Sequence, residues 1–258
     1  VYKNNFGNSY QTANNNWYSI HNPITHDMLT TGEGIFMDSS DDDVYYNKKK
    51  DQKSYTKIMR DFHNLFVKRV LIQKYSNTDT RLMDFAVGKG GDFPKWIHSK
   101  IRFVFGVDIS RDNIENKLDG VCARYLKYKK KYNKIPDVMF LQGDSTKDLI
   151  RGQGYTDERS IMIQNAILGI GTKDKKILGS GVYDLYGIAN KLFDITSIQF
   201  ALHYMFKDKV TLHTFLKNVS NFTKIGGHFI GGCYDGKRVF KYLSKVNNGE
   251  SRNIIKND

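Results

Sequence analysis

A chain of 258 residues, 40% of them hydrophobic and 13% aromatic, can bury a sizeable core, which excludes wholesale disorder and allows one large or two small domains. Forty Lys and Arg against 27 Asp and Glu leave a net charge of +13, which favours polyanionic partners such as nucleic acid or an anionic membrane surface. The two cysteines, Cys122 and Cys233, lie outside any Cys/His cluster, so we expect a reducing compartment, no disulfide scaffold and no metal site.

Residues 1–53 are rich in Asn, Tyr, Ser and Gly and show no sustained hydrophobic period, so we expect an irregular leader or linker. The chain carries no signal-peptide pattern, and no window reaches the roughly 18 to 20 apolar residues that span a bilayer. We therefore expect no membrane segment and a cytoplasmic location, with the nucleus as the alternative. The absence of an initiator Met leads us to expect a domain cut from a longer polypeptide.

From Ser54 onward the pattern predicts alternating helices and strands. Ser54 is a suitable N-cap, and apolar residues spaced by three and four up to Tyr75 predict an amphipathic helix. Short apolar runs predict strands over residues 82–87, 103–107, 137–141, 193–199 and 228–233, with helices over 93–98, 113–132 and 209–222. This alternation is typical of an α/β fold with a mostly parallel, doubly wound sheet. We expect residues 151–191 to form a Gly- and Lys-rich insertion.

Glycines and carboxylates follow the predicted strands at the edge where such sheets bind ligands. After the first strand, residues 87–92 read V-G-K-G-G-D, and these glycines let the backbone turn sharply and approach a ligand. Asp108 follows the second strand at the position of a ribose acceptor, and Asp144 follows the third. Each feature alone is more often a connector or an N-cap. Their order along the chain predicts a pocket for an adenosine-type ligand.

The glycine run does not fit a dinucleotide or an ATP site. Counting from Gly88, the sixth position is Phe93 and not the glycine of G-x-G-x-x-G, and the chain has no G-x-x-x-x-G-K-[ST] motif. The pattern therefore favours a cofactor without phosphates, for which S-adenosylmethionine is the natural candidate.

Three ordered motifs resemble the mRNA cap guanine-N7 methyltransferases. Residues 84–96, D-F-A-V-G-K-G-G-D-F-P-K-W, are similar to the family's first motif. Residues 59–68, M-R-D-F-H-N-L-F-V-K, resemble its leading helix, and residues 198–204, I-Q-F-A-L-H-Y, resemble its Q-F-x-x-H-Y signature. The variant forms, with Val44 to Asn47 and residues 179–183, most resemble the carboxyl-terminal methyltransferase domain of capping enzymes from large DNA viruses.

The resemblance implies a Rossmann-like class I S-adenosylmethionine-dependent methyltransferase domain over residues 54–258. It implies methyl transfer to N7 of the guanine cap of mRNA, with capped RNA as the partner. Triphosphatase and guanylyltransferase domains in the same polypeptide and a stimulatory subunit are further implied partners. Because residues 234–258 match none of the family's later elements, we expect the carboxyl end to be truncated and the sheet to lack its last strands.

The same resemblance implies the residues of the site. The residues that line the cofactor pocket would be Lys68, Ala86, Gly88, Asp108, Asp144, Gln199 and Tyr204. Asn64 and His203 would face the guanine, while Lys89, Lys95 and Arg124 would meet the phosphates and ribose of the cap. Guanine N7 has a lone pair and no proton, so we expect no general acid or base, only orientation by His203 and Tyr204.

Two other functions stay open at this point: a catalytically weak RNA-binding module with this fold, and a small-molecule methyltransferase. The chain has no N-P-P-Y motif and no Pro-Cys pair, which removes the nucleic-acid amino-methyltransferases and the cytosine-C5 enzymes. The Lys- and Tyr-rich run at residues 127–134 is either an RNA-contacting patch or an ordinary solvated helix face.

Overall fold

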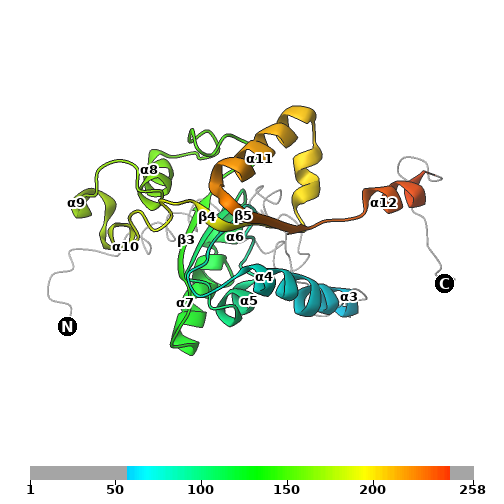
Figure 1. Ribbon diagram of the computed structural model, residues 1–258, viewed down its shortest axis with the longest axis horizontal. Helices are drawn as coiled ribbons and strands as arrows, with labels where there is room; N and C mark the ends of the chain where they lie inside the picture. Colours follow the sequence, from blue (N-terminus) through cyan, green and yellow to red (C-terminus); the bar gives the residue numbers. More distant parts are fainter. Residues whose placement is uncertain (1–56, 245–258) are drawn as a thin grey trace, which may run out of the picture. The chain divides into compact units, whose positions relative to one another are not determined.

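The computed structural model describes residues 57–244 of the chain (Figure 1). The expected leader, residues 1–53, and the expected N-cap Ser54 lie outside the described residues, as does the end of the chain after Ser244. All described residues belong to one compact unit.

The described part contains a parallel sheet of five strands in the order β3-β2-β1-β4-β5. Its strands are β1 (Arg81–Asp84), β2 (Phe103–Asp108), β3 (Asp137–Gln142), β4 (Phe193–Gln199) and β5 (Thr223–Gly232). All five predicted strands are present, although β1 ends three residues earlier than 87 and β5 begins five residues earlier than 228. The order reverses between β1 and β4, which is the switch point where such sheets bind ligands.

Helices cover both faces of the sheet (Figure 1). The first helical segment consists of α3 (Lys57–Phe62), the π-helix η2 (His63–Lys68) and α4 (Arg69–Tyr75), which together confirm a helical segment up to Tyr75. Of the apolar residues predicted to form its packed face, Ile72 is buried, whereas Ile58, Phe62, Leu65 and Phe66 are exposed. The other helices are α5 (Phe93–His98), α6 (Arg111–Glu115), α7 (Val121–Lys131), α8 (Glu158–Ile167), α9 (Lys175–Leu178), α10 (Ser180–Asp184), the 3₁₀-helix η3 (Leu202–Phe206), α11 (Lys209–Phe222) and α12 (Gly236–Leu243).

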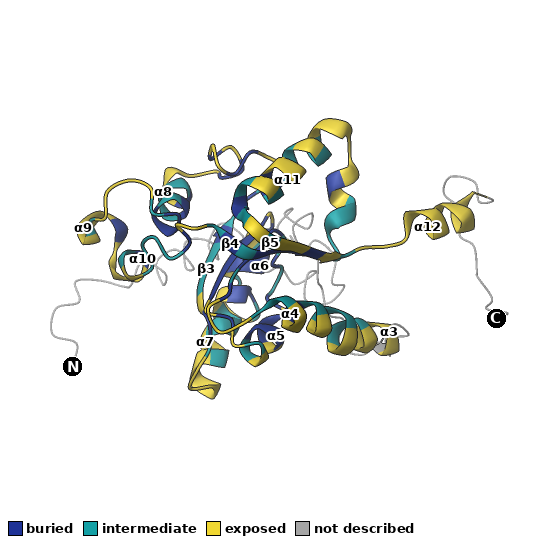
Figure 2. Ribbon diagram, viewed as in Figure 1, coloured by how far each residue is buried: buried dark blue, intermediate teal, exposed yellow. Residues whose placement is uncertain are grey.

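Alternation of side chains along the strands divides the core into two clusters. Met83 and Phe105 pack with residues of α8 and α11, whereas Leu82 and Val104, one position earlier in each strand, pack with residues of α4, α5 and α7. The central strands are therefore buried on both faces, while much of β5 and α12 is exposed (Figure 2). The doubly wound parallel architecture predicted from the alternation is confirmed.

The helix predicted over 113–132 is wrong, because the structure has two helices, α6 and α7, separated by a turn. The side chain of Asn116 accepts hydrogen bonds from the backbone N–H groups of Leu118 and Asp119 at 2.9 and 3.3 Å, which stabilises the turn locally. A Cβ at Gly120 would lie 2.7 Å from the backbone of Asn116, so the closed turn requires glycine. The helix restarts at Val121, whose side chain is buried against the glycine turn.

Residues 151–191, which we expected to form an insertion, contain α8, α9 and α10 and connect β3 to β4. Asp157 caps α8 by accepting a hydrogen bond from the N–H of Ser160 at 2.7 Å. Ile167 and Ala189 from this connection are fully buried in the core with α11. Within residues 57–244, no helix is both long and apolar enough to cross a membrane.

Candidate functional site

The register of the sheet brings chemically active side chains level at one edge. Asp84 at the end of β1 pairs with Ser197 of β4 on one side and with Gly106 of β2 on the other. Asp108 ends β2 and Gln199 ends β4. Because all strands are parallel, these ends and the turns that follow them lie on the same side of the sheet, at its carboxyl edge.

The glycine turn is fixed to the end of β2 by Asp108. The backbone N–H of Gly88 donates to Oδ2 of Asp108 at 2.7 Å, while Oδ1 accepts from the N–H of Ser110 at 3.0 Å and from the amide of Asn113 at 2.9 Å. A carboxylate offers about four acceptor positions, so the buried Asp108 is held rigidly and keeps acceptor capacity. Gly88 has a φ of +53°, and a Cβ there would meet nothing within 4 Å, so the turn borders open space.

A chain of charged contacts joins the π-helix to α5. The ammonium of Lys95 lies 2.8 Å from Oδ1 of Asp92 and 3.3 Å from Oδ1 of Asn64, and the ammonium of Lys68 lies 3.4 Å from Asp92. Asp92 and Lys95 are buried, so their charges interact in a medium of lowered dielectric constant. Three residues predicted from the sequence, Asn64, Lys68 and Lys95, are therefore brought together around Asp92.

Asp84 is buried beside these charged contacts. Its burial and the negative charge of Asp92 raise the pKa of the Asp84 carboxyl to about 7, against the N–H of Ala86 and the positive charge of Lys68, which favour the ionised form. The N–H of Ala86 donates to Asp84 at 3.1 Å. A carboxyl poised near neutral pH at the centre of a sheet edge is typical of functional sites.

We expect Asp84→Asn to change the pH dependence of stability. The folded-state pKa lies above the ordinary value of 3.8, so the folded state binds this proton more tightly, and the stability it contributes is present at low pH and lost as pH rises through about 7. Asn mimics the protonated form, so the variant should gain about 2 kcal/mol relative to the parent between pH 5 and pH 8. Urea unfolding at both pH values measures this. A constant difference, like that expected for Asp79→Asn in an exposed loop, would contradict the assignment.

Aromatic rings gather on the other side of Lys68. The ring of Phe200 lies 5.0 Å from that of His63 and 6.2 Å from that of Tyr234, and the ammonium of Lys68 lies 5.4 Å from its centroid. The ring of His203 lies 5.4 Å from that of Tyr234. Phe200 has a φ of 58°, an uncommon backbone conformation for a residue with a side chain and one that recurs at functional sites. These rings place Phe200 at the centre of a cluster that has apolar faces and polar ring atoms.

Besides Oδ1 of Asn113, which lies next to Asp108, three buried polar atoms in this region have no hydrogen-bond partner within the described part of the chain: Oε1 of Gln199, Nδ1 of His203 and Nδ1 of His63. The amide nitrogen of Gln199 donates to Ser197 at 3.2 Å, so only its oxygen is unsatisfied. Leaving a buried acceptor unpaired costs about 1–3 kcal/mol, and native proteins rarely do so without a functional reason. The atoms lie on β4, η3 and η2, all at the carboxyl edge.

The other predicted residues differ in their surroundings. The ammonium of Lys89 lies 2.8 Å from Asp112 and 2.9 Å from Asp119, so its charge is already paired within the protein. Asp144 accepts from the N–H and hydroxyl of Thr146 at 2.9 and 2.6 Å. Arg124 lies on the first turn of α7, and its side chain makes no hydrogen bond or ion pair with residues 57–244. Tyr204 is 48% exposed on η3.

Sequence reasoning assigned no role to several residues that the structure places here: Asp84, Asp92, His63, Asn113 and Tyr234. Asp84 and Asp92 are the first and last residues of the stretch that contains the glycine turn, so their position in the sequence indicated a role at the site. Tyr234 had none, because it lies just after the last strand without a recognisable pattern around it.

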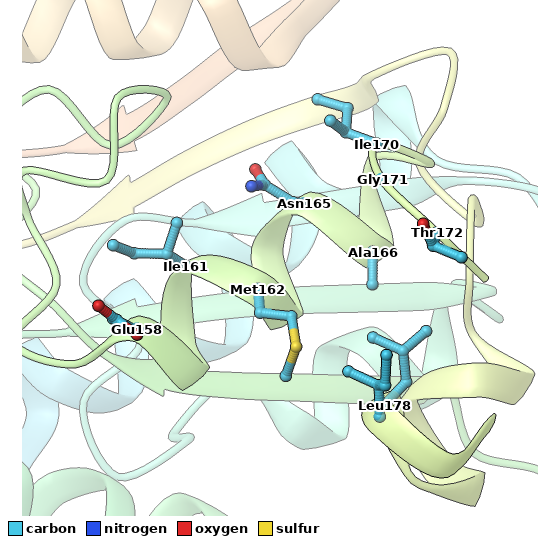
Figure 3. A pocket seen from close by; sticks show the side chains of 10 residues that line it. Glu158, Ile161, Met162, Asn165, Ala166, Ile170, Gly171, Thr172 and Leu178 are labelled. Atoms are coloured by element: carbon cyan, nitrogen blue, oxygen red, sulfur yellow. The ribbon is translucent and has the colours of Figure 1, made fainter. Parts of the chain in front are cut away.

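A separate cavity of about 320 Å³ opens between α8 and α9. Figure 3 shows Met162 and Ala166 of α8 pointing towards Leu178 of α9. Its lining includes no residue from the glycine turn or the strand ends, so it is distinct from the site at the carboxyl edge.

Comparisons with known proteins identify the sequence family of the chain. A family model described as mRNA (guanine-N(7))-methyltransferase domain matches residues 41–256. A probable mRNA-capping enzyme of Acanthamoeba polyphaga mimivirus is 28% identical over 254 residues, which cover 94% of this chain and 20% of the relative. An mRNA cap guanine-N(7) methyltransferase of Caenorhabditis elegans is 29% identical over 234 residues, covering 85% of this chain and 51% of the relative.

A solved structure of an S-adenosylmethionine-dependent methyltransferase from Clostridium acetobutylicum aligns with a TM-score of 0.40 and 14% identity, covering 95% of this chain and 65% of that chain. The chain spans about half the length or less of the curated relatives described above.

Proposed function

Because the chain belongs to the mRNA (guanine-N7)-methyltransferase domain family, we propose that it transfers the methyl group of S-adenosylmethionine to N7 of the guanine cap of mRNA. The observation that carries the proposal is the carboxyl edge of a Rossmann-like class I sheet. There Asp108 fixes the Gly88 turn, and Oε1 of Gln199 is buried without a partner among the described residues. The alternatives of a silent RNA-binding module and a small-molecule enzyme give no reason for residues implied to face guanine, Asn64 and His203, in two of the three ordered motifs.

The residues at this edge fit S-adenosylmethionine. Asp108 keeps acceptor capacity suited to ribose hydroxyls, and the backbone at Gly88 borders open space that a larger side chain would fill. The unsatisfied oxygen of Gln199 can accept from the ammonium or a hydroxyl of a ligand. The residues that would hold the cofactor are Lys68, Ala86, Gly88, Asp108, Asp144, Gln199 and Tyr204. When bound, S-adenosylmethionine supplies an electrophilic methyl group on a sulfonium.

The side chains of this chain act by orientation. Asn64 and His203 would hold the guanine edge, and Lys95 and Arg124 would hold the phosphates and ribose of the cap, with Lys89 joining them if its pairs with Asp112 and Asp119 open. Holding reactants in line can supply roughly 7–11 kcal/mol of the barrier. Fixed dipoles at the edge add to this without moving a proton. No general base is needed, because N7 has no proton to lose.

We also infer which other domains and subunits accompany this domain and where in the cell it acts. The mimivirus relative is named a probable mRNA-capping enzyme, and this chain covers 20% of it, which supports the presence of triphosphatase and guanylyltransferase domains beside this one. A stimulatory subunit and a cytoplasmic location are part of the same proposal. Co-purification of guanylyltransferase activity with the natural polypeptide tests whether a guanylyltransferase domain accompanies this one.

Radiolabelled S-adenosylmethionine and a capped RNA test the activity of the full chain. Label should appear in the capped RNA, and nuclease digestion should release it as a 7-methylguanosine cap, whereas the same RNA with a 5′-triphosphate end should stay unlabelled. Binding of S-adenosylhomocysteine, measured by calorimetry, separates the alternatives. Label transfer to a small molecule but not to RNA would contradict the proposal, as would the absence of any binding.

We expect His203→Ala to reduce kcat/KM for capped RNA by about 10-fold, because the ring helps to place the guanine but exchanges no proton. The affinity for S-adenosylhomocysteine should change by less than about twofold. His213→Ala, which removes an exposed histidine of α11, is the matched control and should leave the kinetics unchanged. A bell-shaped pH profile in the parent that flattens in His203→Ala would show proton transfer and refute the orientation mechanism.

A further inference from the structure

A second cavity, of about 320 Å³, opens beside the charged contacts around Asp92. It lies between the helical segment η2–α4 and α5, and its polar lining consists of Asn64, Arg69, Lys95 and His98. Asn64 and Lys95 also belong to the group around Asp92, so they form a wall shared by the cavity and the candidate site. Arg69 and His98 lie further from Asp92 and were assigned no role by the sequence motifs.

The cavity carries an excess of positive charge. Among residues 57–244, no Asp or Glu lines it. Lys95 and Lys68 share the carboxylate of Asp92, and the Asp84 carboxyl beside them, with a pKa of about 7, is only partly ionised at neutral pH, so this group keeps a net positive charge. Arg69 has no carboxylate partner among residues 57–244, so its charge adds to that excess.

Arg69 is held in place by a neutral contact. Its Nη2 lies 3.0 Å from Nε2 of His98. A guanidinium only donates hydrogen bonds, so this contact requires an unprotonated Nε2, and it orients the guanidinium without neutralising it. The remaining N–H groups keep the planar fork that matches two oxygens of a phosphate. Arg69 and His98 are both exposed to solvent, and a guanidinium without a carboxylate partner among residues 57–244 is suited to a phosphate group.

Because this cavity shares a wall with the residues that would meet the cap, we propose that Arg69, positioned by His98, binds a backbone phosphate of the RNA chain, just after the first transcribed nucleotide. The inference rests on the proposed function, and it adds to it a contact with the RNA body that the cap-binding residues do not supply. A phosphate contact of this kind fixes the position of the RNA without reading its sequence. It makes the enzyme favour capped RNA over an isolated cap.

The first test is the salt dependence of binding. Fluorescence anisotropy of a labelled, capped RNA of about ten nucleotides, with S-adenosylhomocysteine present, gives the slope of log K against log salt concentration. Loss of one phosphate contact to a single strand should reduce the magnitude of that slope by about 0.7 in Arg69→Ala. Arg102→Ala, which removes an exposed arginine at the opposite edge of the sheet, should have the slope of the parent. Equal slopes in the parent and Arg69→Ala would overturn the proposal.

The second test compares a cap dinucleotide with the capped RNA as methyl acceptors. The dinucleotide lacks the phosphate that follows the first transcribed nucleotide, so Arg69→Ala and His98→Ala should raise KM for the RNA by about 5-fold to 10-fold and leave KM for the dinucleotide unchanged. An equal rise in KM for both acceptors would place the contact on the triphosphate bridge and refute the proposal. Inorganic phosphate serves as a competitor in the same assay. If the variants are no longer inhibited by inorganic phosphate but keep the parent's lower KM for the RNA than for the dinucleotide, the cavity binds a free small anion and the proposed RNA contact is wrong.

Failure of the proposed function gives a different result. If the parent methylates neither acceptor, the activity is refuted, while the salt dependence of RNA binding still decides whether Arg69 contacts a phosphate. If the parent methylates both acceptors and the variants match it in both tests, the activity stands and only the Arg69 contact falls.

Discussion

Asp108→Ala is expected to weaken binding of S-adenosylhomocysteine by about 100-fold or more, the largest effect on affinity of any single substitution at the site. A hydrogen bond to a charged group contributes about 1.5–3 kcal/mol, and the remaining acceptor position of this carboxylate is available to a ribose hydroxyl. The substitution also releases the N–H of Gly88, which Asp108 holds at 2.7 Å, so the turn that approaches the ligand loses its anchor. Isothermal titration calorimetry of the full chain measures the change.

The interpretation depends on a folded variant, so the thermal unfolding of Asp108→Ala is measured beside its affinity. Asp108→Asn keeps an oxygen for Ser110 and Asn113 but presents an NH₂ group to the N–H of Gly88, so it should lose affinity almost as strongly while losing less stability. Asp137→Ala removes an exposed carboxylate at the start of β3 and should bind like the parent. Binding by Asp108→Ala within about threefold of the parent would place the ribose elsewhere.

The parts of the fold that were predictable are those with a strong local signal. The apolar run from Phe103 to Val107 marks β2 because a strand buried on both faces tolerates few polar residues, whereas β4 carries Phe193, Ile195 and Ile198 among polar residues. The Lys209–Phe222 helix begins at Asp208, which caps it by accepting from the N–H of Thr211 at 2.7 Å, so its start is also encoded locally. The turn between α6 and α7 was missed because Asn116 and Gly120 interrupt a helical period without a proline.

The site was predictable only in part, because its contacts join segments far apart in the chain. The glycine motif and Asp108 follow from local rules about strand ends. The ring cluster does not, since His63, Phe200 and Tyr234 come from three separate segments and meet only after folding. Lys89 is a residue whose surroundings the motif does not predict. Its place in the motif predicts a phosphate contact, but Asp112 and Asp119, brought close by the turn before α7, already pair with its charge.

The π-helix η2 connects the fold to the site in a way that spacing alone does not reveal. It contains both Asn64 and Lys68 and is continuous with α3 and α4. A π-helical turn is less favourable than an α-helical one and is found mostly at functional positions. Here it spans the residues whose side chains contact Asp92 and Lys95, so the unfavourable backbone coincides with the chain of charged contacts.

Gly90→Ala is expected to lower the free energy of unfolding by about 2–4 kcal/mol, the largest loss of stability from a single added methyl group in the glycine turn. Gly90 has a φ of +70°, where a side chain costs roughly 1–2 kcal/mol. A Cβ there would lie 2.5 Å from the ring of Phe93 and 2.8 Å from Val121, and both side chains are fully buried. Phe93 cannot move aside easily, because its ring packs 5.0 Å from that of Trp96 and 5.2 Å from that of Tyr128.

The neighbouring glycine provides the matched control for this prediction. Gly91 has no positive φ, and a Cβ there would meet nothing within 4 Å, so Gly91→Ala should change the free energy of unfolding by less than about 1 kcal/mol. Urea unfolding of both variants, followed by tryptophan fluorescence, measures the difference, since Trp96 lies next to Phe93. If the two variants were equally stable, the Gly88 to Asp92 turn would not have the backbone conformation described, and Asp108 would lose the partner through which it positions the ligand-binding edge.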